Sequence, residues 1–262
     1  MEVYPNGYYN YKAGRKDAKE KETAKVLEQI KELYHNANGV PGYRAMKSLL
    51  SAKGIELSAP TVHKYMNYVL GLQSITRKKK KYTKPKEEPY AVFPDKFQQN
   101  FTSDETGKKW CIDFTYIHFG NGKKRYNCSI IDLHNREVVA SVNGSRINAD
   151  LARQAVETAI GRIGKREGLI LHSDRGSQFT SKSFVEFCKK TGITQSMSRP
   201  GCPYDNAPME RYFNTLKTEL LYIHEYETEK ALYLGINAYA YGYYNNKRPH
   251  SFNGGVAPAK VK

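Results

Sequence analysis

Three acidic residues placed on apolar segments constrain this chain more than any other feature of its sequence. Asp113 lies inside a strand-like apolar run, Asp174 closely follows another, and Glu210 falls in the first turn of a predicted amphipathic helix. Pro208 favours that helix start, because its missing N–H costs no helical hydrogen bond in the first turn. Thirty-five residues lie between Asp174 and Glu210. Two neighbouring strands with a helix packed across them would bring the three carboxylates together.

A metal site is the interpretation that this combination of acids favours. Each acid alone has an ordinary explanation, because aspartates suit turns and strand ends and Glu210 suits a helix N-terminus. Together, three unpaired carboxylates would repel one another unless hard cations neutralised them. Two magnesium ions held by such oxygens can stabilise the attacking and leaving oxygens of a phosphodiester displacement. Lys217 lies two turns after Glu210, where we expect it to hold a phosphate of DNA.

The charge of the chain indicates a polyanionic partner. The formal net charge is +16 at pH 7, and the sequence pI is about 9.5. Residues 1–100 carry a net charge of +9, and residues 101–262 carry +7. Because both halves are basic, we expect nucleic acid to contact both of them.

Membrane and secreted classes do not fit the sequence. No apolar run approaches the ~20 residues that a membrane span requires, and the N-terminus lacks the apolar region of a secretory signal. The four cysteines are widely spaced. We therefore expect reduced thiols, with neither a zinc cluster nor a disulfide framework, in a cytoplasmic protein.

The N-terminal part has the pattern of a helix-turn-helix. We predict helices over residues 19–34, 43–53 and 59–69, with Ser58 as the N-cap of the third. The second helix of such a motif can lie in the major groove. The basic tract 77–81 follows, and we predict that it is a linker that neutralises phosphates along a DNA backbone. The residues that we expect to contact DNA here are Tyr43, Arg44, Ser58, Thr61, Lys64, Lys78, Lys79 and Lys80.

The remainder of the chain alternates strands and helices. This order predicts an α/β fold, a mixed sheet flanked by helices. The predicted strands are 109–119, 125–133, 137–145, 169–173 and 193–197, and the predicted helices are 148–163, 182–191, one from Glu210 and 227–245, followed by an extended tail from Arg248. The predicted division is a leader (1–20), a helix-turn-helix module (21–75), a basic linker (76–100), a catalytic core (101–225) and a C-terminal helix and tail (226–262).

Three further features of this part remain open in the sequence. The Gly- and Pro-containing loop 198–208 is expected to be mobile and to order on substrate. His172 either packs in the interior or supports the acidic site. The sequence offers no partner for His250.

Several blocks in this order resemble a known family. Residues 110–117, 171–178 and 205–217 resemble the three motif blocks of retroviral-integrase-type DDE transposases. The likeness is greatest to the second-reading-frame protein of bacterial insertion sequences of the insertion-sequence-three family. Residues 244–251 resemble the C-terminal block of that group, and residues 41–62 resemble its helix-turn-helix segment. The likeness extends over nearly the whole chain, from Ala24 to Ala259.

The resemblance implies a ribonuclease-H-like core of five strands that binds two Mg²⁺ (or Mn²⁺) ions through Asp113, Asp174 and Glu210. It implies cleavage at the ends of a mobile element and attack of the freed 3′-OH on another phosphodiester, without a covalent enzyme–DNA intermediate. The implied partners are the terminal inverted repeats, target DNA and further copies of the chain at the bacterial nucleoid. Nothing in the chain resembles the upstream-frame module of such elements, so the active enzyme is expected to be a fusion with that module or to use it as a partner.

Two other functions are compatible with these features. A catalytically silent DNA-binding regulator of the parent element would bind DNA without turnover under any metal. A nuclease of the same fold without sequence specificity would degrade DNA or RNA–DNA hybrids and never join ends.

Overall fold

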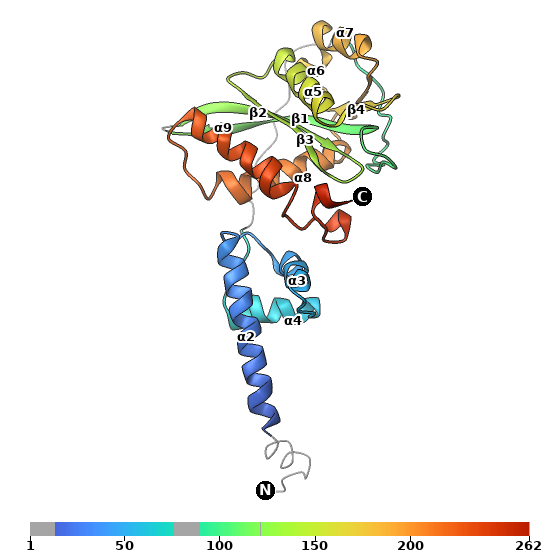
Figure 1. Ribbon diagram of the computed structural model, residues 1–262. Helices are drawn as coiled ribbons and strands as arrows, with labels where there is room; N and C mark the ends of the chain where they lie inside the picture. Colours follow the sequence, from blue (N-terminus) through green and yellow to red (C-terminus); the bar gives the residue numbers. More distant parts are fainter. Residues whose placement is uncertain (1–13, 76–89, 121, 262) are drawn as a thin grey trace. The chain divides into compact units, whose positions relative to one another are not determined.

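The computed structural model describes residues 14–75, 90–120 and 122–261 (Figure 1). The chain divides into two units, Met1–Thr76 and Arg77–Lys262, which we call the helical unit and the core unit. Lys78, Lys79 and Lys80 of the predicted linker lie outside the described residues.

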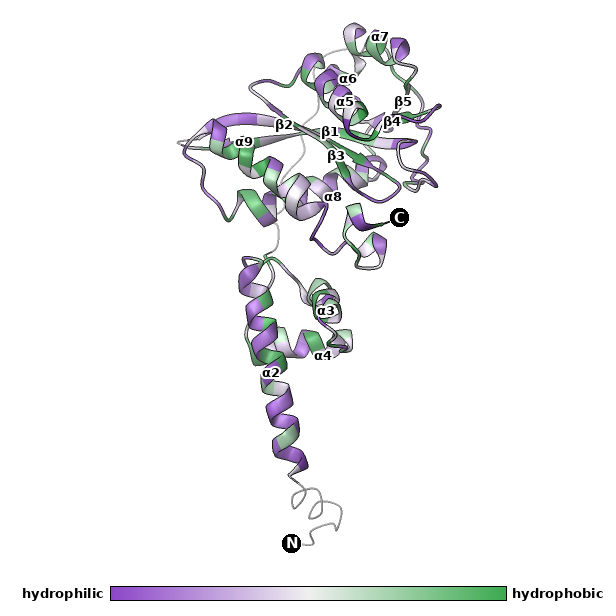
Figure 2. Cartoon of the chain, viewed as in Figure 1, coloured by the Kyte–Doolittle hydropathy of each residue, from purple (hydrophilic) through white to green (hydrophobic). Residues whose placement is uncertain are grey.

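The helical unit forms around a small apolar core. Its helices are α2 (Arg15–Asn36), α3 (Tyr43–Ala52) and α4 (Ala59–His63), and α4 continues directly into η1 (Lys64–Val69). The first turns of α2 are mostly hydrophilic (Figure 2). Further along, α2 contributes Ile30 to the core. The fully buried side chains of this core are Ile30, Met46, Leu50, Val62 and Met66.

The third predicted helix begins and ends as expected but changes type partway. Ser58 caps its N-terminus, because the Ser58 Oγ accepts a hydrogen bond from the Thr61 N–H at 3.3 Å. The turns from Lys64 are π-helical, and the Leu70 N–H donates to the Tyr65 carbonyl, five residues back. Met66, which lies within these turns, is fully buried in the core.

The core unit contains a mixed five-stranded sheet with the strand order β3-β2-β1-β4-β5. The strands are β1 (Lys109–Phe119), β2 (Lys123–Asp132), β3 (Val138–Gly144), β4 (Ile170–Ser173) and β5 (Thr194–Met197). β1 pairs antiparallel with β2 and parallel with β4. The change from antiparallel to parallel pairing therefore falls at β1, the strand that carries Asp113.

Helices cover both faces of this sheet (Figure 1). On one face lie α5 (Ala149–Ile163), α6 (Ser177–Thr180) and α7 (Lys182–Lys190). On the other lie α8 (Ala207–Leu216), η3 (Lys217–Leu221), α9 (Glu229–Asn237) and η4 (Ala238–Tyr244), with the short 3₁₀ turn η2 (Pro203–Asn206) before α8. None of the helices in the described ranges is long and apolar enough to cross a membrane.

The prediction of an extended tail from Arg248 is wrong. The segment forms two 3₁₀ turns, η5 (Ser251–Asn253) and η6 (Pro258–Lys260), and it is tied to the core. Arg248 makes a forked ion pair with the buried Glu219, at 2.8–2.9 Å for three nitrogen–oxygen contacts. The Tyr239 hydroxyl also donates to Glu219, at 2.7 Å. These contacts join positions far apart in the sequence, which explains why the local pattern did not indicate them.

Residues in and directly after η4 cover the outer edge of β3. The Asn245 side chain accepts a hydrogen bond from the Val138 N–H at 2.9 Å and donates to the Val138 carbonyl at 3.0 Å. The Tyr241 hydroxyl accepts from the Ser141 N–H at 2.8 Å. These side chains therefore satisfy main-chain groups that an edge strand otherwise exposes.

The pKa of His250 predicts a loss of stability in mild acid. Burial, together with the positive charges of Arg248, Arg136 and Arg211, lowers the pKa of His250 from 6.5 to about 4. Between these pH values the unfolded chain binds a proton that the folded protein does not, so stability should fall as the pH drops from 6.5 towards 4. Burial also lowers the pKa of His172, which adds to the loss over pH values just below 6.5. Chemical denaturation across this range should give a shallower pH slope for His250→Gln than for the wild type, and equal slopes would contradict the assignment.

Candidate active site

The register of two parallel strands sets Asp113 beside Asp174. In the pairing of β1 with β4, Cys111 stands opposite His172. Two residues further along, the same register places Asp113 opposite Asp174, which directly follows the end of β4. Neighbouring strands lie about 4.8 Å apart, and residues paired in this way share a face. The two aspartates therefore project side by side from the same face of the sheet.

Helix α8 covers this face and brings Glu210 towards the pair. Its residues Met209, Tyr212 and Leu216 pack in the same apolar cluster as Cys111 of β1. Glu210 lies in the first turn of α8, where its side chain is exposed. Its negative charge raises the pKa of Asp113. The structure thus places the three acids around one part of the sheet, and their role as catalytic and metal-binding residues stays a prediction.

The electrostatics of Asp113 depend on all three acids. Burial raises the pKa of Asp113 well above its usual value, and the negative charges of Asp174 and Glu210 raise it further. The Phe114 N–H and the positive charge of Lys217 act in the opposite direction. Burial likewise raises the pKa of Asp174, and a hydrogen bond from the Gly176 N–H opposes this. The carboxyl groups therefore lie where an added positive charge would be stabilised.

Hydrogen bonds fix the orientation of both aspartates. The Phe114 N–H donates to Asp113 Oδ1 at 2.7 Å, and Asn206 Nδ2 donates to Asp113 Oδ2 at 3.2 Å. The Gly176 N–H donates to Asp174 Oδ1 at 2.9 Å. No group of three or more His, Cys, Asp and Glu side chains within the described ranges is arranged so that it could hold a metal ion directly.

The loop before α8 is braced at its end. Asp205 is fully buried and accepts hydrogen bonds from the main chain and guanidinium of Arg199 at 2.9–3.1 Å and from Gln99 Nε2 at 3.1 Å. The Arg199 guanidinium holds the pKa of Asp205 far below its usual range. This bracing fixes the residue before Asn206. The expected mobility of the loop 198–208 stays a prediction.

His172 is packed in the interior. Its ring is fully buried, with Nδ1 2.8 Å from the Ser196 Oγ and Nε2 3.1 Å from the Ser198 Oγ. It stacks on the Phe97 ring with the centroids 4.8 Å apart. A buried imidazole with both nitrogens engaged is typical of a structural residue, and it joins β4 to β5 and to the start of the loop.

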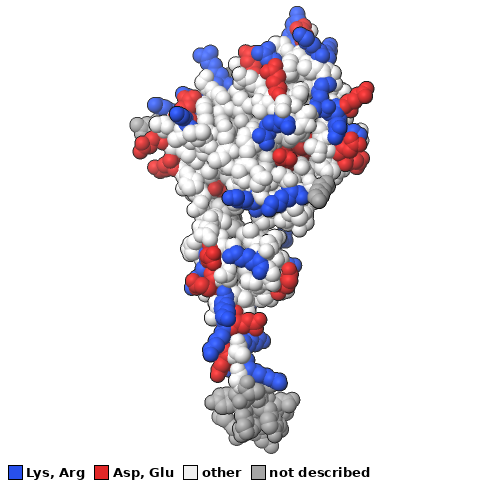
Figure 3. Space-filling view, viewed as in Figure 1, with Lys and Arg blue, Asp and Glu red and all other residues white. Residues whose placement is uncertain are grey.

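The predicted DNA contacts of the helical unit differ in their exposure. Arg44 and Lys64 are exposed, whereas Tyr43 and Thr61 are half-buried, and Ser58 is occupied with the cap. Sequence reasoning missed His63, which packs edge-on against two tyrosine rings. Its ring centroid lies 5.1 Å from that of Tyr43 and 5.7 Å from that of the exposed Tyr68. On the face that Figure 3 shows, Lys and Arg side chains lie over both units with acidic side chains among them.

Lys217 lies close to the acidic residues, as predicted. It begins η3, directly after α8, and its Nζ stands 4.6 Å from the centroid of the Tyr116 ring. Its charge lowers the pKa of Asp113. Tyr116 lies three residues after Asp113 on β1 and is 43% exposed. Sequence reasoning missed this aromatic neighbour because its strand position alone did not distinguish it from core residues.

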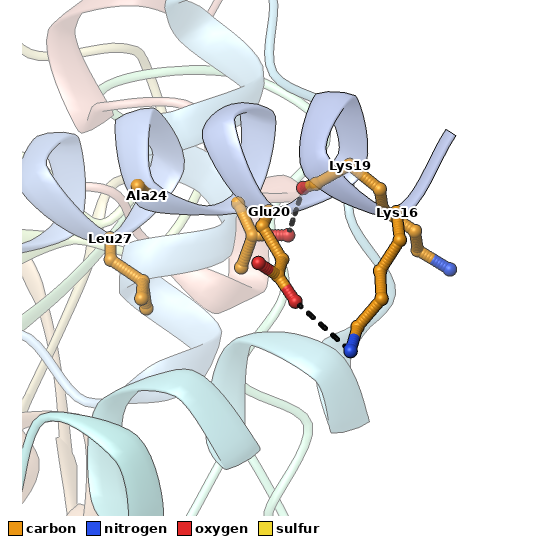
Figure 4. Close-up of a pocket in the computed structure, with 6 residues that line it drawn as sticks. Lys16, Lys19, Glu20, Ala24 and Leu27 are labelled. Atoms are coloured by element: carbon orange, nitrogen blue, oxygen red, sulfur yellow. Dashed lines mark hydrogen bonds and ion pairs between the residues drawn. The ribbon is translucent and has the colours of Figure 1, made fainter. Parts of the chain in front are cut away.

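A hollow of about 350 Å³ lies elsewhere, along α2 (Figure 4). All of its lining residues come from this one helix, including Leu27, Ala24 and the ion pair of Lys16 with Glu20 at 3.9 Å. It contains none of the three predicted catalytic acids, so it is not part of the candidate active site.

Family models match both units. Two models described as integrase core domain match residues 103–203 and 191–258, and a model described as HTH-like domain matches residues 21–80. With the mixed sheet and its two helical layers, they confirm the predicted ribonuclease-H-like fold with an N-terminal helix-turn-helix module. The matched models and the fold define a DNA-recombination protein of the integrase class.

Two related proteins show which family within this class the chain belongs to. The transposase for insertion sequence element IS904 of Lactococcus lactis is 34% identical over 239 residues, covering 90% of this chain and 93% of that protein. InsK of insertion sequence element IS150 of Escherichia coli K12 is 31% identical over 257 residues, covering 97% and 88%. The chain therefore belongs to the transposases of the insertion-sequence-three (IS3) family, which cut and join DNA.

Among solved structures, the HTLV-2 integrase catalytic core domain in complex with magnesium is similar, with a TM-score of 0.45 and 19% identity. The likeness covers 59% of this chain and 95% of that one.

Proposed function

We propose that this transposase cleaves the ends of its parent insertion sequence and joins the freed 3′-OH to another DNA phosphodiester, with Asp113, Asp174 and Glu210 as the catalytic and metal-binding residues. The observation that carries the proposal is the position of Asp113. Burial and the charges of two acids from separate elements all raise the pKa of its carboxyl. Two buried acids with structural contacts differ from it: Asp205 pairs with Arg199, and Asp132 is held by three hydrogen-bond donors.

A divalent metal ion fits this donor set. Integrase cores as a family depend on such ions. Each oxygen of Asp113 accepts one hydrogen bond and keeps a further lone pair. Asp113, Asp174 and Glu210 would hold the ions, two Mg²⁺ or Mn²⁺ in this proposal. When bound, such ions activate the attacking oxygen and stabilise the charge on the leaving oxygen of the phosphodiester.

The other residues of the site bind and orient the DNA. Lys217, beside the acids, supplies a positive charge for a phosphate next to the scissile bond. In the helical unit, Arg44 and Lys64 present exposed charge from α3 and from the start of η1, and we propose that they contact DNA together with Tyr43, Thr61 and Ser58. Lys78, Lys79 and Lys80 would neutralise further phosphates.

The proposed DNA partners are the terminal inverted repeats and the target DNA, reached in the cytoplasm at the bacterial nucleoid. Joining two ends requires that both be held together, so we propose a multimer of this chain on DNA. An upstream-frame protein, as a partner or fused to this chain, remains part of the prediction. The proposed division of labour assigns end recognition to the helical unit and chemistry to the core unit.

The function is tested by incubating the full chain with Mn²⁺ or Mg²⁺ and a duplex that carries the element end. Nicking at the end followed by joining is the expected result. Metal chelation should abolish both steps. Salt-dependent binding without turnover would identify the silent regulator instead, and degradation without joined products would identify a nuclease without sequence specificity.

Lys217→Ala should weaken end binding and strand transfer. Loss of one phosphate contact should lower the slope of log Kobs against log salt concentration by about 0.9, and strand transfer should fall roughly 10- to 100-fold, since a hydrogen bond to a charged group contributes about 1.5–3 kcal/mol. Lys217→Arg should recover part of the loss. The matched control is Lys182→Ala on α7, an exposed lysine paired with Glu186 at 3.8 Å. Equal salt slopes for the wild type and Lys217→Ala would remove the phosphate contact from the proposal.

A further inference from the structure

We propose that Asn206 is a positioning residue, whose side-chain amide fixes the carboxylate of Asp113 in the orientation that the metal ions require. This inference rests on the proposed function, because it assigns Asn206 a task only if Asp113 is a metal ligand. Asn206 precedes α8, is 6% exposed and donates from Nδ2 to Asp113 Oδ2 at 3.2 Å. Sequence reasoning treated it only as part of a motif block.

The bond from Asn206 completes a clamp on Asp113. The Phe114 N–H holds Oδ1 at 2.7 Å, and Asn206 holds Oδ2. A carboxylate with a donor on each oxygen cannot rotate about its terminal bond without losing one of them. Each oxygen still has a lone pair for a cation. Because an ionised carboxylate only accepts hydrogen bonds, the amide NH₂ of Asn206, and not its carbonyl, must face Asp113.

The side chain of Asn206 does not cap the helix that follows it. It stands at the N-cap of α8, where an asparagine side chain usually accepts a hydrogen bond from the first turn, but it makes no such bond. Its Oδ1 is instead buried and has no hydrogen-bond partner among the described residues. A buried acceptor without a partner is unfavourable. The structure therefore retains an unfavourable local arrangement that keeps the amide on Asp113.

The neighbouring residue makes this arrangement rigid. Asp205 is fully buried and held by the main chain and guanidinium of Arg199 and by Gln99. The backbone at Asn206 is thus fixed from one side by Asp205 and from the other by α8. If Asp113 held a hydrated magnesium ion, Oδ1 of the same amide would be an acceptor for a water molecule that the ion retains.

The test is direct Mn²⁺ binding to the full-length protein, measured by the electron paramagnetic resonance of the free ion. Asn206→Ala should weaken Mn²⁺ binding about 10- to 100-fold, as expected when a partner that orients a ligand is removed. Strand transfer should fall by a similar factor and recover in part at high Mn²⁺ concentration. The matched control is Asn237→Ala on α9, because Asn237 also has a buried carbonyl oxygen without a partner among the described residues.

Asn206→Ser separates positioning from capping. Serine is a good N-cap residue, so this variant should be at least as stable to heat as the wild type, yet its side chain is too short to hold Asp113, and Mn²⁺ binding should still weaken. Mn²⁺ affinity within twofold of the wild type in both variants would overturn the inference. Failure of the proposed function has a different signature, namely unchanged Mn²⁺ binding and strand transfer in Asp113→Asn.

Discussion

Asp113→Asn should abolish cleavage and strand transfer, lowering the rate on the order of 10³-fold or more, while leaving DNA binding intact. The amide has almost the same shape as the carboxylate but lacks its charge, so it is a poor ligand for a hard cation. The measurement is strand transfer of a labelled element end with Mg²⁺ and with Mn²⁺, together with an equilibrium binding assay of the same duplex.

Stability separates this effect from misfolding. Burial and neighbouring acids raise the pKa of Asp113 above its ordinary value of 3.8. At pH values above 3.8, the charged form of Asp113 therefore destabilises the folded state. Without metal at pH 7, Asp113→Asn should therefore melt at the same or a higher temperature than the wild type, and the difference should shrink as the pH falls towards 3.8. The matched control is Asp150→Asn, which should stay active. Asp150 forms an exposed ion pair with Arg153, with 3.6 Å between Oδ1 and Nη2. Persistent strand transfer in the double variant Asp174→Asn and Glu210→Gln would contradict the assignment.

Asp132→Ala should destabilise the core unit by about 3–5 kcal/mol, because it leaves several buried donors without an acceptor. Asp132 is fully buried. Its carboxylate accepts from the Gly107 N–H at 2.6 Å, from Trp110 Nε1 at 2.9 Å and from the His134 N–H at 2.8 Å. Denaturant unfolding followed by far-ultraviolet circular dichroism measures the change.

The control for this prediction is an acid on the surface. Asp150→Ala removes one partner of an exposed pair and should change the free energy of unfolding by less than about 1 kcal/mol. A loss below about 1 kcal/mol for Asp132→Ala would show that water replaces the carboxylate at these donors.

The sequence predicted the strands around the acids well, because their apolar patterns are local. The predicted strand 109–119 coincides with β1, and the others differ from the observed strands by at most two residues at either end. The adjacency of Asp113 and Asp174 follows from the parallel pairing of β1 with β4. The sequence indicated that these strands could be neighbours, but it could not specify the register.

The remaining features depend on contacts between distant residues. The forked pair of Arg248 with Glu219 holds the tail on the core, and the two residues are 29 positions apart in the sequence, too far for a local pattern to indicate the contact. The π-helical turns from Lys64 and Lys217 differ from α-helix only in their hydrogen bonds, which side-chain periodicity does not specify. In the sequence Asn206 was only one residue of a motif block, and the contact of its amide with Asp113 depends on the packing of distant segments.

The covered outer strands of the sheet have a consequence for how copies of this protein can associate. Asn245 occupies the open side of β3, and at β5 the Met197 N–H donates to the carbonyl of Pro94, in the segment before the sheet, at 3.4 Å. A strand from a second molecule would have to displace these groups before it could pair, which protects against runaway stacking into fibrils. Copies gathered on DNA in the proposed multimer would therefore meet through helices and loops, where contacts can end at a defined number of subunits.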